Sequence, residues 1–122
     1  MSGTRSEGRE IIPTAGTRFE PFDQYGEVVD GLSWLKLNYD SQAVRGYYLL
    51  RFAPGARSLP HIHTALEEFI ILEGELVDSD GTTFRKGDFV RFQPGSQHFS
   101  ISPHGCLILV FLHGRNQVLK DY

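Results

Sequence analysis

The chain has 122 residues, of which 40% are hydrophobic and 22% are charged, and its net charge is −3 with the five histidines neutral. This length predicts a single domain, with a flexible N-terminus over residues 1–10 and the folded domain over residues 11–122. Twelve Lys and Arg against fifteen Asp and Glu leave no basic excess, which argues against a nucleic-acid partner. A domain of this size can fold without a disulfide or a structural metal, so we expect any bound metal to serve function.

Cys106 is the only cysteine, which excludes an internal disulfide and makes the cytoplasm the default compartment. The longest apolar run, Leu107–Leu112, is far shorter than the ~20 residues needed to span a bilayer. The first ten residues lack the apolar core of a signal peptide. We therefore expect no membrane partner.

Glycine and proline recur every several residues from Gly16 to Pro103, which leaves no room for helices of ordinary length. The segments between them are short and rich in β-branched and aromatic residues, a composition typical of strands. Short strands at this spacing predict an all-β antiparallel sandwich or barrel. The predicted strands are Leu32–Leu37, Val44–Phe52, Glu67–Leu72, Phe89–Gln93, His98–Ile101 and Cys106–His113.

Four residues could hold a metal ion. Side chains alternate between the two faces of a strand, so His61 and His63 project from the same side. Glu67 shares their parity if the chain stays extended, and His98 follows a Pro-Gly turn at the start of another strand. Three neutral imidazoles and a carboxylate suit a divalent first-row metal such as Fe, Mn, Zn, Ni or Cu.

A His-x-His pair by itself is more often two polar residues on a solvated face. The wider spacing from Gly55 through the two histidines and Glu67 to Gly74 argues otherwise. With this composition the pattern should arise by chance in about 10⁻⁴ of such chains. The spacing therefore favours a functional motif.

These positions carry a resemblance to a known family. Gly55, His61, His63, Glu67 and Gly74 resemble the first cupin motif at each of its defining positions. Gly87, Gly95 and His98 resemble the second motif, with Gln93 where the family usually has proline. The resemblance implies a single all-β domain, an antiparallel double-sheet jelly-roll barrel. It also implies one divalent metal ion, held by His61, His63, Glu67 and His98.

A narrower likeness lies in the segments His61–Phe69, Leu72–Leu76 and Pro94–His98. They resemble the cupin group that includes the C-terminal domain of ChrR-type anti-sigma factors and the dioxygenases that cleave β-diketones and acetophenones. This likeness implies an Fe(II)-dependent dioxygenase acting on a small dicarbonyl or phenolic ketone, with Zn, Mn or Ni as other possible metals. The alternatives are a non-catalytic Zn-binding sensor or binding module, and a metal-dependent isomerase or lyase acting on a sugar acid. Small cupins also pair commonly, so the resemblance implies a homodimer.

Phe69 and Ile71 share the parity of Glu67, so we expect them to line a substrate pocket beside the metal, to pack in the core, or both. Trp34, Tyr47 and Arg51 lie on predicted strands and could offer an inward polar group to a substrate, although a surface position is favoured for Arg51. The remaining candidates are assigned to the solvated surface or to the core: Glu68, Glu73, Glu75, His104, His113 and Cys106.

Overall fold

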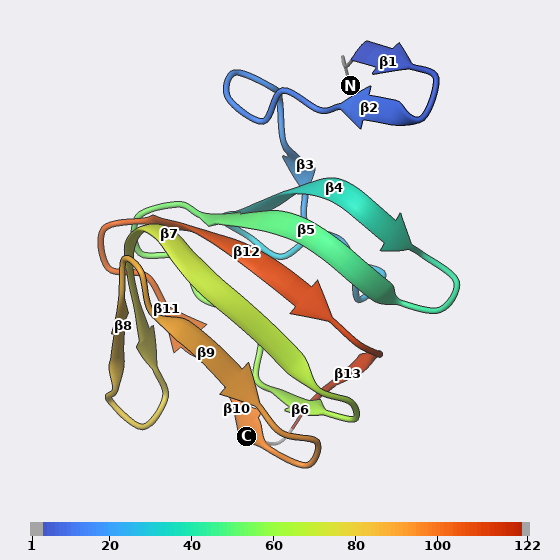
Figure 1. The fold of residues 1–122 in the computed structure, drawn as a ribbon. Coiled ribbons are helices and arrows are strands. Elements are labelled where there is room, and N and C mark those ends of the chain that lie inside the picture. The colour runs from blue at the N-terminus through green and yellow to red at the C-terminus, as the bar shows by residue number, and fades with distance from the viewer. Residues whose placement is uncertain (1–3, 121–122) are drawn as a thin grey trace.

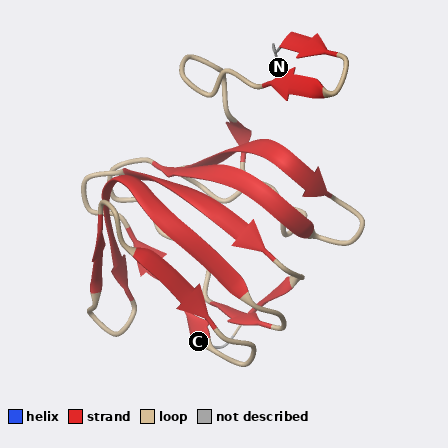
Figure 2. Cartoon of the chain, in the orientation of Figure 1, coloured by secondary structure: helices blue, strands red, loops and turns tan. Residues whose placement is uncertain are grey.

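The computed structural model of the protein describes residues 4–120, and every regular element in that range is a strand (Figure 2). Two antiparallel sheets form the barrel (Figure 1). The larger has the order β11-β7-β12-β5-β4-β3, with β8 and β9 also paired to β7, and the smaller has the order β10-β6-β13. The strands of the larger sheet are β3 (Glu20–Pro21), β4 (Leu32–Asp40), β5 (Arg45–Phe52), β7 (Glu67–Asp78), β8 (Thr83–Arg85), β9 (Phe89–Phe92), β11 (Ser100–Ile101) and β12 (Cys106–Leu112), and those of the smaller are β6 (His61–His63), β10 (Gln97–His98) and β13 (Asn116–Val118).

The architecture confirms the predicted all-β single-domain barrel. Alternation fixes which side chains enter the core: along β12, Ile108, Val110 and Leu112 are buried, while the residues between them are partly exposed. Aromatic rings fill the end of the core near Trp34, whose ring centroid lies 4.8 Å from that of Phe22. Residues 4–120 contain no helix long and apolar enough to cross a membrane.

Strand β7 turns the corner between two groups of partners. Its first part pairs with β9 and β12, and its last part pairs with β8 and β11. Gly74 lies at the corner with a φ of 76°, and a Cβ there would lie 2.2 Å from the carbonyl oxygen of Gly105. Only glycine fits this crossing without displacing backbone.

The N-terminal region differs from the expectation that structure begins near Ile11. Strands β1 (Thr4–Ser6) and β2 (Arg9–Ile11) form a hairpin around a turn at Glu7 and Gly8. Within the described residues this hairpin makes a sheet of its own, and Figure 1 shows it apart from the barrel. Two-residue turns with glycine favour such pairing locally, a signal that the polar composition of this region concealed. The flexibility of residues 1–10 stays a prediction.

The other strand predictions agree with the structure except in two respects. The strand expected over His98–Ile101 is interrupted at Phe99, because β10 pairs with β6 whereas β11 pairs with β7. Strands β3, β8 and β13 were not predicted, since each has only two or three residues and no run of β-branched side chains.

Candidate metal centre

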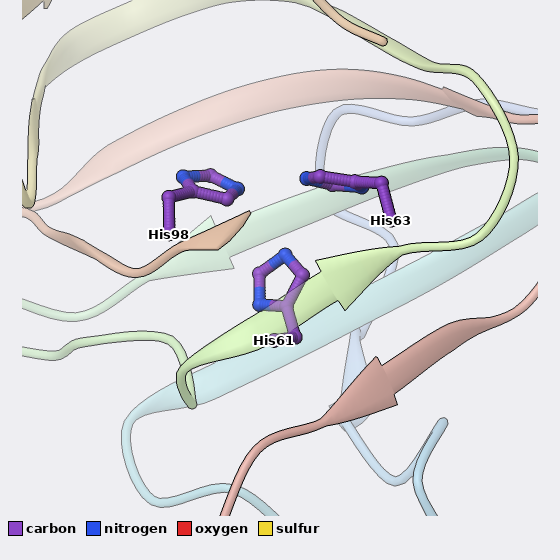
Figure 3. Close-up of side chains that lie close together, drawn as sticks. All are labelled: His61, His63 and His98. Carbon is purple, nitrogen blue, oxygen red and sulfur yellow. The ribbon is translucent and has the colours of Figure 1, made fainter. Parts of the chain in front are cut away.

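Three buried imidazoles meet where β6 and β10 pair. His61 and His63 project from the same side of β6, as their parity predicts, and His98 lies opposite His61 in the register of the two strands. One ring nitrogen from each histidine lies within 4.8 Å of those of the other two. Figure 3 shows the three rings gathered around one space.

Each ring is held through its Nδ1 atom. The acceptors are the carbonyl oxygen of Leu59 at 2.6 Å for His61, the side-chain oxygen of Asn116 at 3.0 Å for His63, and the carboxylate of Asp78 at 2.6 Å for His98. Because all three partners are oxygen acceptors, we assign the proton of each neutral ring to Nδ1. The lone pair is therefore on Nε2.

The Nε2 atoms of His63 and His98 are buried and have no hydrogen-bond partner among the described residues. A buried polar atom without a partner is costly unless a ligand occupies it. A nitrogen lone pair is the donor that a first-row metal ion takes from histidine, with Nδ1–H bonded to an outer partner. The histidine set therefore fits a divalent metal ion.

Burial favours the neutral form of His61 and His63. Desolvation lowers the pKa of His61 to about 4, and it also lowers the pKa of His63. The charge of Glu67 acts in the opposite direction on both rings but is the smaller effect. At neutral pH both imidazoles are therefore in the form that binds metals.

Glu67 is buried at the start of β7 but is not part of the three-histidine set. Its Oε1 accepts a hydrogen bond of 2.8 Å from the Nδ2 of Asn116 and lies 3.7 Å from the Nδ1 of His63. The chain bends at Thr64 and Ala65, so β7 begins in a different sheet from β6 and simple parity no longer applies. Glu67 as a fourth metal ligand stays a prediction.

Three residues that support the histidines were missed by sequence reasoning. Asn116 bridges His63 and Glu67 through the two ends of its amide, and Asp78 accepts a hydrogen bond from His98. Phe92 stacks on His98 with ring centroids 4.0 Å apart, and on His63 at 5.1 Å. None of the three belongs to a metal-binding motif. The sequence offered one signal for them: alternation along Phe89–Phe92 places Phe92 on the inward face together with Val90.

A cavity of about 40 Å³ adjoins the histidines. Phe69 lines it, whereas Ile71 is buried in the core and is not among the lining residues. Tyr25 and Tyr48 also line it, and burial raises the pKa of both phenols well above the ordinary value. Both hydroxyls therefore stay protonated and can donate hydrogen bonds.

The other candidate residues lie away from this cavity. Trp34 is buried in the core, Tyr47 is exposed, and the exposed Arg51 stacks on the ring of Phe19. Glu68 is bonded to Arg91 and to the exposed His113. The others lie at the surface or in the core: Glu73, Glu75 and His104 outside, and Cys106 inside.

A family model described as the ChrR cupin-like domain matches residues 9–115. The chain belongs to this cupin family. The match covers β2 to β12, all three histidines, Asp78 and Phe92, and it ends one residue before Asn116. A search of curated protein sequences found no match.

Solved structures of several cupins have the same fold. An acetylacetone dioxygenase from Acinetobacter johnsonii has a TM-score of 0.76 and 17% identity, over 99% of this chain and 85% of that one. The complex of SigE with the anti-sigma ChrR from Rhodobacter sphaeroides has a TM-score of 0.63 and 20% identity, over 80% of this chain and 50% of that one. A sugar phosphate isomerase from Silicibacter pomeroyi has a TM-score of 0.53 and 32% identity, over 67% of this chain and 59% of that one. The three differ in function, so the likeness establishes the fold and leaves the chemistry to the site.

Proposed function

We propose that this cupin binds one divalent metal ion through His61, His63 and His98, with Fe(II) favoured, and acts as a dioxygenase on a small dicarbonyl or phenolic ketone. The observation that carries the proposal is the pair of buried Nε2 atoms without partners, on rings whose Nδ1 atoms are all held. The likeness in fold to an acetylacetone dioxygenase supports the choice of reaction.

A bound divalent ion of this kind would polarise the substrate carbonyl as a Lewis acid, and iron would also supply redox chemistry with dioxygen. The chain contributes position and environment. Phe69 and the other aromatic residues of the cavity exclude water, and the phenols of Tyr25 and Tyr48 can donate hydrogen bonds to a carbonyl oxygen. Asp78 and Asn116 hold two of the three rings in the orientation that the ion needs.

The test is to measure metal content and oxygen consumption together. Protein purified without added metal under anaerobic conditions should carry, or take up, one equivalent of iron, and the iron-loaded form should consume oxygen with acetylacetone or a hydroxyacetophenone. His63→Ala should lose both properties, whereas His113→Ala, at an exposed histidine, should keep both. Oxygen uptake that persists unchanged in His63→Ala would contradict the proposal.

A second function, a Zn-binding sensor or binding module, is favoured by the small size of the cavity. A volume of about 40 Å³ leaves little space for a substrate beside an ion. The likeness to the structure that contains ChrR supports this alternative too. One equivalent of tightly held zinc with no oxygen consumption by the iron-loaded protein would favour it over the dioxygenase.

An isomerase or lyase acting on a sugar acid is the weakest of the three proposals. A sugar acid carries several hydroxyls, each of which needs a polar partner when buried. The walls of the cavity are mainly aromatic and aliphatic, with Phe22, Leu50 and Phe69 among them. Failure of sugar acids to bind the metal-loaded protein in calorimetry would remove this alternative.

We also propose that the protein forms a homodimer in the cytoplasm. The support is an apolar patch on the outer face of the large sheet, aligned by strand register and made of the partly exposed Leu109 and Ile70 and the half-exposed Phe89. Phe89→Glu should shift the mass measured by light scattering from dimer to monomer. Thr82→Glu, in an exposed turn, is the matched control and should leave the mass unchanged.

A further inference from the structure

The cavity beside the histidines is narrow, and its size bears on how a ligand reaches it. Its volume of about 40 Å³ is far below the roughly 300–1,000 Å³ of pockets that hold small molecules. It has room for little more than a water molecule, which occupies about 30 Å³ in the liquid. A dicarbonyl substrate therefore requires part of the wall to move.

Tyr25 is the part of the wall that separates this cavity from the surface. It lines the cavity, and it also lines two surface grooves of about 560 Å³ and about 450 Å³. It is the one residue that borders all three spaces. Its ring lies 6.4 Å from that of His61 and 5.8 Å from that of Phe22, and its hydroxyl lies within hydrogen-bonding reach of Asn116.

The segment that carries Tyr25 has a fixed base and an exposed tip. At the base, Phe22 and Val29 are both buried, and the backbone N–H of Val29 donates to the carbonyl of Phe22. Between them, residues 23–28 are exposed apart from Gln24 and Tyr25. Gly26 follows Tyr25 directly, with a φ of 95° and open space around it. The backbone of the tip can thus move while Phe22 and Val29 stay in place at its base.

The two grooves differ in charge. The groove along β13 has one charged residue in its lining, Arg115, and it shares Asn116 with the cavity. The other groove contains the carboxylates Glu27 and Asp30. An anionic ligand such as the enolate of a diketone is therefore attracted to the groove along β13 and repelled by the other.

We propose that Tyr25 is the gate of the metal cavity and limits the size of the ligand, and that an anionic or enolisable ligand enters past it from the groove along β13. This inference rests on the proposed metal centre. Outward movement of residues 23–28 withdraws the ring from beside His61 and joins cavity and groove into one space. Retention of the ring by Phe22 and Asn116 keeps the cavity closed at other times.

The test is kinetic and uses metal-free protein mixed with Co(II) in a stopped-flow instrument, followed by removal of the ion with dipicolinate. A minor open state is typically populated at ~0.1–10%, and the ion passes only while the cavity is open. Tyr25→Ala holds the cavity open, so the rates of Co(II) uptake and removal should rise by about 10-fold or more. A gate affects the passage of the ion in both directions equally. The rates of uptake and removal should therefore rise together, and the dissociation constant for Co(II) should change little. Tyr25→Phe keeps the ring and its contact with Phe22 but loses the hydroxyl that reaches Asn116, so its rates should lie between those of the wild type and Tyr25→Ala. Val28→Ala, at an exposed position on the same tip, is the matched control and should keep the wild-type rates.

The entrance is tested with acetylacetone and the Co(II)-loaded protein, observed through the visible spectrum of the ion. Arg115→Ser should slow the association of acetylacetone, whereas Glu27→Ser, in the other groove, should not. Tyr25→Ala should also admit dibenzoylmethane, a larger diketone that the wild type excludes. Uptake and removal rates in Tyr25→Ala that match those of the wild type would overturn the gate while leaving the metal centre intact. Absence of Co(II) uptake by the wild type would overturn the proposed function and the gate with it.

Discussion

The two sheets of the barrel differ in what they turn inward. The small sheet directs polar side chains to the interior, with His61 and His63 on β6, His98 on β10 and Asn116 on β13. The large sheet supplies mostly apolar ones, such as the residues of β12 that alternate into the core. The difference indicates that ligand chemistry and stability depend on separate parts of the fold. Substitutions can therefore affect one and leave the other largely intact.

The strongest test of this separation is His63→Ala on β6. Metal affinity should fall by more than the roughly 100-fold that loss of a supporting partner costs, since a ligand itself is removed. The metal-free protein should lose less stability than it does with Phe69→Ala, because the substitution removes a buried nitrogen that has no partner together with the hydrogen bond to Asn116. Isothermal titration with Zn²⁺ and urea unfolding measure the two quantities. A large loss of metal-free stability with unchanged affinity would contradict the separation.

Phe69→Ala on β7 should have the opposite pattern. Phe69 is 2% exposed, and removing a buried phenylalanine typically costs about 3–5 kcal/mol. The urea midpoint of the metal-free protein should fall accordingly, while the folded fraction should still bind Zn²⁺. Val28→Ala, at a side chain that is 64% exposed and outside the proposed dimer patch, is the control and should cost less than about 0.5 kcal/mol. Equal losses for the two variants would mean that Phe69 is not a core residue.

Asp78→Asn sharpens the comparison, because Asp78 ends a strand of the large sheet and yet orients His98. The substitution keeps the size of the side chain and removes its charge, so metal affinity should fall by about 10-fold, as for other partners of metal-bound histidines. Asp80→Asn, nearby in an exposed turn, should leave the affinity unchanged. The hypothesis fails if the two variants bind Zn²⁺ equally well.

The last prediction concerns the stability of the metal-free protein in acid. His61 takes up a proton near pH 6.5 when unfolded but only near pH 4 when folded, so the unfolded state binds more protons between these values. The free energy of unfolding should therefore fall as the pH drops from 6.5 toward 4, by up to about 1.4 kcal/mol per pH unit from this group. Urea titrations at several pH values should give a shallower slope for His61→Ala than for the wild type. Identical slopes would refute the prediction.

The features that could be predicted from the sequence are those that depend on residues close together in the chain. The alternation of strands placed His61 and His63 on one side of β6, and glycine and proline spacing indicated the barrel. Glu67 lies only four residues further on, but the bend at Thr64 takes it into another sheet. Strand alternation therefore could not predict whether Glu67 lies beside the ion.

The residues that support the histidines could not be found in this way. Asn116 reaches His63 because β13 pairs with β6, in a register that places the two residues opposite each other. That pairing joins residues 53 positions apart, and no local pattern specifies it. The same holds for Phe92, whose stacking on His98 follows from how β9 and β10 are folded against each other.

The wide spacing of these partners along the chain also has a consequence for the order of folding. Nonlocal strand pairs form slowly, since a long loop must close before its contacts contribute. The contact between His98 and Asp78 closes a loop of 20 residues, and the contact between His63 and Asn116 closes one of 53. The histidines are thus assembled only when the barrel is nearly complete. An ion that needs all three would bind as a late step and slow unfolding, and it would give no help to the early steps of folding.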